Sequence, residues 1–397
     1  MINRRRLLEF GVTASLAWGA RSAFAKNIGS DPRFVLVILR GGMDGLAAVP
    51  PYADPSYRKS RGALALPPPG SASGINDLDG FFGLHPNFVT LHALFEAGEL
   101  TVVQAVAPPY RNRSHFDAQD VLETGIPAPS ALTDGWLYRA LATLPGAVRT
   151  DEYAMAIGGA VPRVLRGANP VGAWSPDRLP DPDDDTMARI VALYEHDAIL
   201  GPRLRTMMKT ENMMASQVNR SNQGSRNNSL AGVVKAAAQF LCHESGPRVA
   251  VLESGGWDTH AQQGDQQGQL ANRFASLDDL VAQFRAELGD TWRQTVLIMV
   301  TEFGRTVAMN GTRGSDHGVA GAAFVMGGAV AGGKVFTDWP GLKRAALYEG
   351  RDLMPTMDVR VLFKTALVDH LGADAAAVDE FVFPSSALTG LQGLTRV

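Results

Sequence analysis

Six short apolar runs constrain the fold of this chain more than any other feature. Residues 34–39 form the clearest run, because it is continuously apolar and rich in β-branched side chains, as in a strand buried on both faces. The other runs are residues 100–105, 153–157, 248–252, 295–300 and 323–326. Helical patterns lie between them, for example at residues 86–97, 186–200, 230–241, 268–288 and 358–371. This alternation predicts an α/β fold with a doubly wound, mostly parallel sheet and helices on both faces.

Two segments differ from this pattern. Residues 66–80 are rich in Pro, Gly, Ser and Asp, which is typical of a surface loop. Residues 202–229 are rich in Met, Asn and Ser and end with little apolar content. We interpret them as part of a small helical insertion, a possible cap at about residues 165–229, within one domain that covers residues 26–397.

The first 25 residues are predicted to be a removable export signal. Three consecutive arginines at positions 4–6 precede an apolar run at residues 10–20, and residues 23–25 read Ala-Phe-Ala, a small-x-small cleavage signature. The adjacent arginines favour the twin-arginine translocase, although any secretory signal begins with a basic segment. The run is too short for a stable membrane anchor, which needs about 20 apolar residues. We therefore expect cleavage after Ala25 and a periplasmic or extracellular protein.

Composition excludes several classes of protein. Removal of the signal takes away four arginines and one glutamate, so the net charge changes from −3 to −6. A protein of this negative charge is not expected to bind nucleic acid. Cys242 is the only cysteine, so no internal disulfide can form and the core depends on burial alone. The sequence has no Gly-x-Ser-x-Gly elbow, no phosphate loop and no dinucleotide glycine motif after a strand.

Polar clusters follow the predicted strands, where doubly wound sheets bind their ligands. Arg40 and Asp44 follow the first run together with three glycines, which also suit an ordinary turn. Arg113, Ser114 and His115 follow the second run. They combine a guanidinium that can bind an anionic substrate, a hydroxyl that can act as nucleophile and an imidazole, although Ser114 could instead cap a helix. The later clusters are Asp258 and His260, Glu302 and Arg305, and Asp316 and His317. Carboxylates and imidazoles at four strand ends predict a metal or catalytic site.

The remaining histidines are expected to be structural. His85 and His92 fall in one predicted helix, and His196, His243 and His370 fall in helices or at helix ends.

Five motifs in a fixed order carry a resemblance to a known family. They are RGGMDGL at residues 40–46, RSHF at 113–116, GWDTH at 256–260, TEFGRT at 301–306 and DHG at 316–318. Behind a twin-arginine signal, and over essentially the whole mature chain, they resemble the bacterial domain-of-unknown-function family 1501. That family is similar to the alkaline phosphatase and sulfatase superfamily, whose members hold one or two metal ions at strand ends and attack phosphate or sulfate esters.

The resemblance implies a role for each motif. Asp44 resembles the metal ligand after the first strand, Ser114 the nucleophile, and Asp258, His260 and His317 further metal ligands. Glu302 and Phe303 stand where the superfamily has Asp-His, and Phe cannot bind a metal. One metal site is therefore lost or rebuilt, with Asp316 or His115 as substitute ligands.

These observations leave two hypotheses. The first is an exported hydrolase of phosphate or sulfate esters, in which one or two divalent ions (zinc, manganese, calcium or magnesium) activate Ser114. Arg40, Arg113 and Arg305 would then neutralise an anionic small-molecule or glycan ester. The second hypothesis is a non-catalytic binding or assembly module of the periplasm or cell surface, which the Glu302-Phe303 pair favours.

Overall fold

The computed structural model describes residues 31–145, 150–175, 184–194, 197–217, 230–386 and 388–396. The predicted export signal with its cleavage site at Ala25, and also His196, lie outside the described residues. Pro32–Val397 forms one compact unit.

A central sheet organises this unit, and it is parallel except for one strand. Its order is β10 (Lys334–Phe336), β4 (Leu100–Ala107), β9 (Gly321–Met326), β8 (Thr295–Thr301), β1 (Arg33–Leu39), β7 (Val249–Ser254), β5 (Ala154–Ile157) and β6 (Gly172–Trp174), with β11 (Met357–Asp358) also pairing to β4. β9 alone among these strands runs antiparallel to its neighbours, β4 and β8. The sheet confirms the predicted α/β class, and all six predicted strands are present. A separate hairpin joins β2 (Asn76–Asp77) and β3 (Gly83–Leu84).

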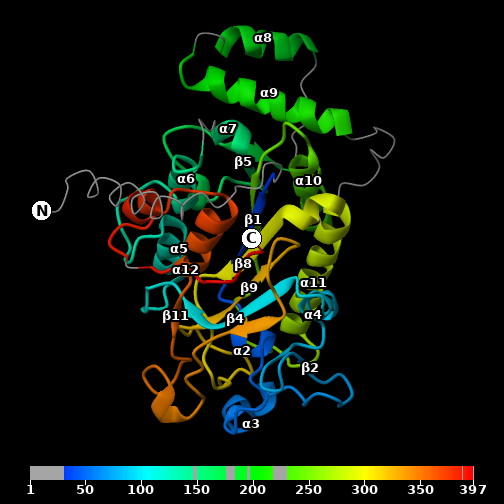
Figure 1. Ribbon diagram of the computed structural model, residues 1–397, viewed down its shortest axis with the longest axis vertical. Coiled ribbons are helices and arrows are strands. Elements are labelled where there is room, and N and C mark those ends of the chain that lie inside the picture. Colours follow the sequence, from blue (N-terminus) through cyan, green and yellow to red (C-terminus); the bar gives the residue numbers. More distant parts are fainter. Residues whose placement is uncertain are drawn as a thin grey trace, which may run out of the picture. The chain divides into compact units, whose positions relative to one another are not determined.

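Helices cover both faces of the sheet (Figure 1). One face holds α4 (Val89–Glu96), α10 (Leu230–Cys242) and α11 (Gln269–Leu288), and the other holds α5 (His115–Thr124), α6 (Trp136–Leu141) and α12 (Arg360–Thr365). Side chains of β1 point alternately to the two faces. Val35 and Val37 pack in the first core, on the face with α4, α10 and α11, and Phe34 and Leu36 pack in the second core, on the face with α5, α6 and α12. Because both faces are covered, β1 needs apolar residues at every position, which explains its continuous apolar run.

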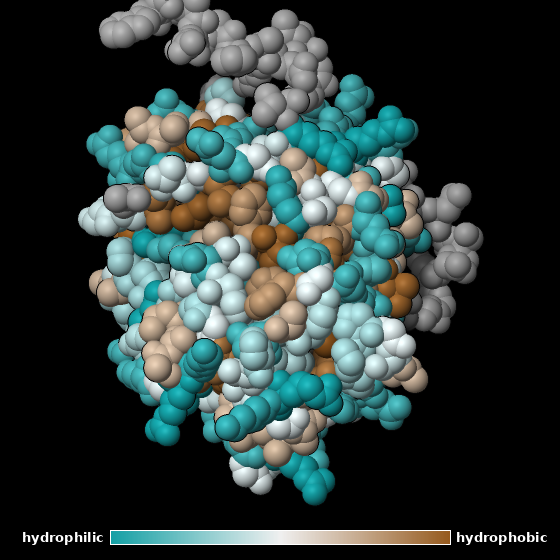
Figure 2. Space-filling model, turned by 60° about the horizontal axis from the view of Figure 1, so that its bottom comes forward, coloured by the Kyte–Doolittle hydropathy of each residue, from teal (hydrophilic) through white to brown (hydrophobic). Residues whose placement is uncertain are grey.

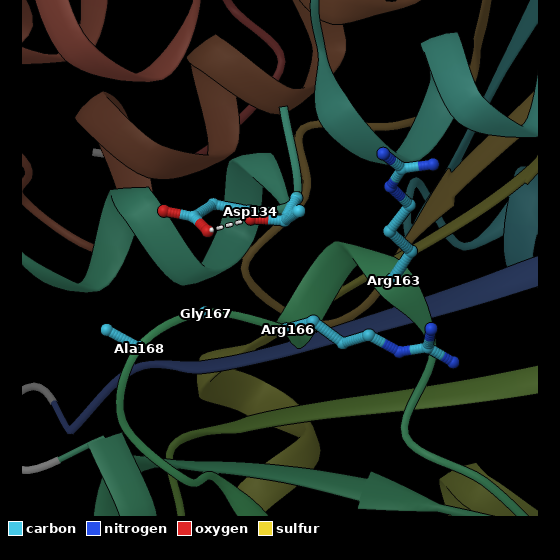
Figure 3. A pocket seen from close by; sticks show the side chains of 6 residues that line it. Asp134, Arg163, Arg166, Gly167 and Ala168 are labelled. Atoms are coloured by element: carbon cyan, nitrogen blue, oxygen red, sulfur yellow. Dashed lines mark hydrogen bonds between the residues drawn. The ribbon is translucent and has the colours of Figure 1, made fainter. Parts of the chain in front are cut away.

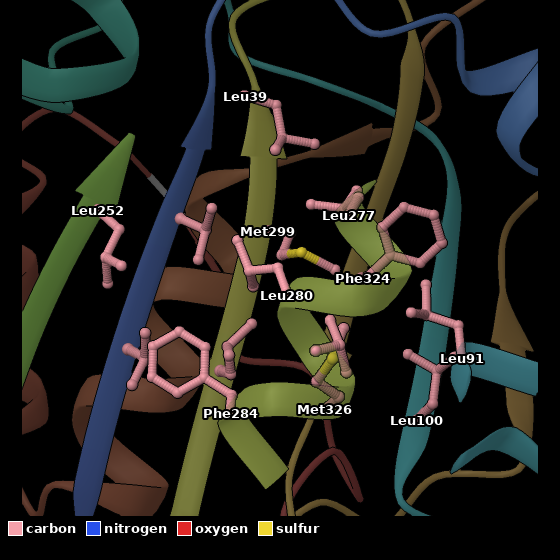
Figure 4. Close-up of a cluster of buried hydrophobic side chains, with 14 of the residues drawn as sticks. Leu39, Leu91, Leu100, Leu252, Leu277, Leu280, Phe284, Met299, Phe324 and Met326 are labelled. Atoms are coloured by element: carbon pink, nitrogen blue, oxygen red, sulfur yellow. The ribbon is translucent and has the colours of Figure 1, made fainter. Parts of the chain in front are cut away.

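The first core is shown in Figure 4. Side chains of the sheet meet those of α4 and α11 there, and those labelled are Leu39, Leu91, Leu100, Leu252, Leu277, Leu280, Phe284, Met299, Phe324 and Met326. Full burial of one such side chain stabilises the fold by about 1.5–3 kcal/mol.

Two helix boundaries differ from the sequence prediction. The helix expected at residues 86–97 begins only at Val89, so His85 precedes it, and only His92 lies on it. The helix expected at residues 186–200 ends at Tyr194, and a new helix, α9 (Leu200–Gln217), begins after Asp197. The Asp197 carboxylate accepts the backbone N–H groups of Ile199 and Leu200 at 2.8 and 2.7 Å, which starts the new helix.

The remaining helices are short or peripheral to the sheet. They are α2 (Gly45–Ala48), α3 (Tyr57–Arg61), α7 (Thr150–Tyr153), α8 (Asp184–Tyr194) and α13 (Ala375–Ala377). α8 and α9 lie within the segment for which the sequence predicts an insertion, and α9 contacts β6 and α10. In the space-filling view, apolar side chains gather in a band on one side of an otherwise largely polar face (Figure 2). None of the helices in the described ranges is long and apolar enough to cross a membrane.

Candidate metal centre

Five chain segments meet at one edge of the sheet. The parallel strands β1, β4, β7 and β8 all end there, and the residues that follow them are the polar clusters of the sequence. β9 is antiparallel, so the segment that precedes it, with Asp316 and His317, reaches the same edge. The sheet order β4-β9-β8-β1-β7 places these five ends side by side. Residues more than 200 positions apart thereby come into contact.

Three imidazoles and one carboxylate form the centre of this edge. The Nε2 atom of His317 lies 3.0 Å from Nε2 of His115 and 3.0 Å from Nε2 of His260. The Asp258 carboxylate lies beside all three rings, at 3.0 Å from Nε2 of His260, 3.2 Å from that of His317 and 3.5 Å from that of His115. His115, Asp258 and His317 each offer one ligand atom, and these three atoms lie within 4.8 Å of one another.

Each imidazole is held through its other nitrogen, Nδ1. Nδ1 of His115 lies 2.8 Å from the Glu302 carboxylate, and Nδ1 of His317 lies 3.0 Å from the backbone carbonyl of Arg113. Nδ1 of His260 lies 3.1 Å from the Asp316 carboxylate. A carbonyl or an ionised carboxylate only accepts hydrogen bonds, so each Nδ1 is the donor. In a neutral ring the unprotonated nitrogen is then Nε2, and the Nε2 atoms of His115 and His260 both face Nε2 of His317.

The donor set fits a bound cation. Lone pairs that face each other at 3.0 Å repel unless a proton or a metal ion lies between them. Burial and the neighbouring His115 lower the pKa of His317, which disfavours a proton on that ring, whereas Glu302 raises the pKa of His115. Ligand atoms of a tetrahedral zinc ion lie about 3.3 Å apart, since each is about 2.0–2.1 Å from the metal. The observed spacings of 3.0–3.5 Å are close to that value. Imidazoles that donate their second nitrogen to a carboxylate or carbonyl are the usual surroundings of a protein metal ion.

Glu302 supports the centre from inside the protein. Its carboxylate is fully buried and accepts hydrogen bonds from the Gly41 backbone at 2.8 Å, from His115, and from Gln119 at 3.2 Å. Burial alone would raise the pKa of Glu302, but these hydrogen bonds outweigh it and the pKa is lowered. The ionised Glu302 in turn raises the pKa of His115. The structure thus places Glu302 behind a candidate ligand, where it orients His115.

Arg305 and Asp316 occupy similar supporting positions. The buried Arg305 guanidinium donates to Asp258 at 2.6 Å and to the backbone carbonyl of Ser315. Burial would raise the pKa of Asp258, but Arg305 and the two nearby histidines outweigh it and lower the pKa. Asp316 accepts from Asn310 at 2.9 Å as well as from His260, and these hydrogen bonds lower its pKa.

Phe303 forms an apolar wall of the centre. Its ring centroid lies 4.7 Å from that of His115 and 4.8 Å from that of His317. Gly41 and Gly42 allow this close packing. A Cβ at Gly42 would lie 2.5 Å from the Phe303 ring, and one at Gly41 would lie 2.6 Å from the backbone nitrogen of Asp258. Both glycines also have positive φ angles, which other residues rarely adopt.

Ser114 lies directly before His115, at the N-cap position of α5. Its side chain makes no capping hydrogen bond, so the structure does not show the helix-capping role that was the alternative interpretation of the sequence. The hydroxyl therefore stays a predicted nucleophile, next in sequence to His115.

Asp44 lies apart from the group of three imidazoles. One of its oxygens accepts the backbone N–H groups of Leu46 and Ala47, each at 3.1 Å. The other accepts from the buried Arg61 guanidinium at 2.6 Å and from Gln263 at 2.7 Å. Four donors already bind this carboxylate, which leaves no free oxygen lone pair for the metal ion that the sequence predicts here.

The predicted substrate-binding arginines all have carboxylate partners. Arg40 pairs with Glu123 at 2.7 Å and also with Glu253. Arg113 pairs with the buried Asp352 and with Glu349, each at 2.7 Å. With Arg305 bound to Asp258, no guanidinium of this predicted trio is left without an acidic partner.

Sequence reasoning missed several supporting residues. Gln119 lies four residues after His115 on α5, so helical spacing could have placed it on the same side of that helix. Gln263 donates to Asp44 and accepts from the Thr259 hydroxyl at 2.9 Å and from the Ser315 hydroxyl at 2.6 Å. Arg61 follows no predicted strand, and nothing in the sequence connects it to Asp44.

Of the histidines expected to be structural, three have structural partners. His85 is buried and its Nε2 lies 2.9 Å from the Asp265 carbonyl, and His92 and His370 likewise bond to backbone carbonyls.

Several solved structures show a weak similarity to this one. The lipoteichoic acid synthase LtaP from Listeria monocytogenes has a TM-score of 0.41 and 10% identity, over 89% of this chain and 74% of that chain. The phosphonate monoester hydrolase of Agrobacterium radiobacter has a TM-score of 0.36 and 10% identity, over 86% and 74%. The PsFucS1 sulfatase from Pseudoalteromonas sp. has a TM-score of 0.39 and 14% identity, over 100% and 78%. These similarities are too low to transfer an activity.

A search of curated proteins finds no match. The model of one protein family, described as "Protein of unknown function (DUF1501)", matches residues 104–381, and this span contains all the ligand candidates that meet at the centre. The chain therefore belongs to the DUF1501 family, as its five motifs indicate.

Proposed function

We propose that this protein is an exported hydrolase of phosphate or sulfate esters that depends on one divalent ion held by His115, Asp258, His260 and His317. The observation that carries the proposal is the cluster of His115, Asp258 and His317, whose three ligand atoms lie within 4.8 Å of one another. Nε2 of His260 lies 3.0 Å from both Asp258 and His317, and every Nδ1 is directed to an acceptor. Imidazole ligands favour zinc over calcium or magnesium, which prefer oxygen ligands, and the Asp258 carboxylate also suits manganese.

The chain's own residues would divide the chemistry as follows. Such an ion would polarise an ester oxygen and stabilise the negative charge that develops on it. Ser114 would provide the attacking hydroxyl, since it adjoins His115 and its side chain makes no capping bond. Glu302 and Asp316 hold two imidazoles in the tautomer that leaves Nε2 free. Phe303 limits the access of water on one side of these rings.

The test combines metal content with turnover. Purified protein should contain about one zinc or manganese per chain, and His115→Ala, Asp258→Ala and His317→Ala should each lower this content by at least ~10-fold at limiting metal. His243→Ala is the matched control, because that imidazole lies after α10 and contacts only Ser245 among the described residues. Ser114→Ala should abolish hydrolysis of aryl phosphates and sulfates but keep the metal. Wild-type protein that binds no divalent ion would refute the proposal.

The alternative is a binding or assembly module that keeps the metal but has no turnover. The ion pairs of Arg40 and Arg113 favour it, because these guanidiniums are already bound to carboxylates. A stoichiometric metal with no hydrolysis of either ester class would support this alternative.

Export is a separate part of the proposal and depends on the N-terminal sequence alone. Replacing Arg4 and Arg5 by Lys should keep the protein in the cytoplasm, since the twin-arginine route requires the guanidinium pair and not only positive charge. Cell fractionation measures the export of that variant, and normal export would refute the twin-arginine route.

A further inference from the structure

A cavity of 490 Å³ lies between α9 and the segment that precedes β6, and the metal ligands do not line it. This volume is in the range of small-molecule sites, about 300–1,000 Å³. Its walls combine two kinds of side chain. Val161, Leu165, Val171 and Met207 are apolar, whereas Arg166 and Arg203 carry the charge. No acidic side chain among the described residues lines it.

Both arginines have donors to spare. Nε of Arg166 donates to the Val161 carbonyl at 2.9 Å, and its two terminal nitrogens find no acceptor among the described residues. The Arg203 guanidinium has no hydrogen-bond acceptor in the described part of the chain. Thr206, in the same wall, donates to the Asp151 carboxylate at 3.1 Å. These two arginines thus differ from Arg40 and Arg113, which are neutralised by carboxylates.

Arg166 also borders two neighbouring cavities. One, of 470 Å³, is lined by Asp134, Arg163 and Ala168, and in Figure 3 the guanidiniums of Arg163 and Arg166 lie on the side away from Asp134. The other, of 340 Å³, reaches Gln119, which donates to Glu302. Arg163 is paired with Asp120. Arg166, by contrast, lines all three cavities and still has free donors.

We propose that the 490 Å³ cavity is a second ligand site, which binds an amphipathic organic acid with one anionic head and an apolar body. The head accepts hydrogen bonds from Arg166 and Arg203, and the body replaces water along the four apolar side chains. Charge complementarity selects the acid over a neutral molecule of the same shape. The site does not depend on the proposed hydrolase activity.

The experiment measures the binding of 1-anilinonaphthalene-8-sulfonate by fluorescence, with decanoate and decanol as competitors. Wild-type protein should bind about one saturable equivalent, and decanoate should displace it at concentrations where decanol does not. Arg166→Glu and Arg203→Glu should each weaken binding by about tenfold or more, because each removes a charge-assisted contact and adds a repulsive charge. Urea midpoints close to that of the wild type would show that the variants remain folded.

Arg205→Glu is the matched control, since it makes the same charge change on the same helix but lines a different cavity. Its affinity should stay within about twofold of wild type. Equal losses in all three variants would overturn the proposal, as would displacement by decanol equal to that by decanoate, or the absence of saturable binding. Metal content and ester turnover are measured on the same samples, so a failure of the hydrolase proposal remains distinguishable.

Discussion

Replacing Glu302 by Gln tests the metal centre without removing any ligand. The Oε1 atom of Gln can still accept from Gly41, His115 and Gln119, as the carboxylate does. The new amide NH₂ would face the Thr301 hydroxyl, which lies 3.0 Å from Oε2 and can accept while it donates to the Leu39 carbonyl. The substitution therefore keeps the geometry and removes only the charge.

The loss of this charge should weaken metal binding by about tenfold, or about 1.4 kcal/mol. An ionised carboxylate increases the electron density that His115 offers at Nε2, and a neutral amide does so less. Competition with a fluorescent zinc chelator gives the dissociation constants of both proteins. Urea unfolding of the metal-free forms shows whether the variant keeps its fold.

Glu253→Gln provides the matched control, since it makes the same chemical change at a partly exposed carboxylate that contacts Arg40 and no imidazole. Its affinity for zinc should remain within about twofold of wild type. If Glu302→Gln also stays within twofold, the reasoning that Glu302 tunes a metal ligand is refuted. An equal loss in both variants would indicate a general effect of charge.

Three further outcomes follow from buried polar groups. Burial lowers the pKa of His85 to about 4, below the ordinary 6.5. The contribution of neutral His85 to stability is therefore complete above about pH 6.5 and is lost as the pH drops toward 4. Urea unfolding should show a loss of about 2 kcal/mol between pH 7 and pH 5, and the His85→Gln variant should lack this loss. Arg61→Met should cost about 3–5 kcal/mol of unfolding free energy, because it leaves the buried Asp44 charge without its partner, and adding Asp44→Asn should recover part of the loss in the same assay. Gln263→Leu should lower zinc affinity although it removes no ligand, since Gln263 holds the Ser315 hydroxyl that Arg305 contacts; chelator competition would show no change if this connection is irrelevant.

The sequence predicts the sheet well because burial on both faces leaves a strong signal. A strand such as β1 needs six consecutive apolar residues, and this requirement is visible without any knowledge of its partners. Helix boundaries are less predictable, since they depend on local capping. Asp197 starts α9 by accepting two backbone N–H groups, and its sequence context alone does not distinguish this conformation from a continued helix.

The ligand candidates could be predicted for a related reason. Asp258 and His260 follow a strand, and a parallel sheet brings strand ends together, so topology alone places them at one edge. Roles within the edge could not be predicted. Whether a carboxylate faces the centre, like Asp258, or stands behind an imidazole, like Glu302, depends on side-chain directions that a linear pattern does not contain. The pairing of Asp44 with Arg61 had no signal at all, because Arg61 lies on α3, away from any strand end.

The charges around the centre give an independent reason to expect a divalent ion. Asp258, Glu302 and Asp316 contribute three negative charges, and their lowered pKa values keep them ionised near neutral pH. Arg305 contributes one positive charge, which leaves an excess of two negative charges beside three imidazoles with inward lone pairs. Unbalanced charge at a partly buried site is costly, and a side-chain cation able to balance it would have to reach the imidazoles. Arg113 and Arg351 are nearby candidates, but Arg113 is bound to Asp352 and Glu349, and Arg351 is bound to Asp352 and to the backbone carbonyl of His317. A single ion of charge +2 would satisfy the charge balance and the lone pairs together, whereas a monovalent ion would satisfy only the lone pairs.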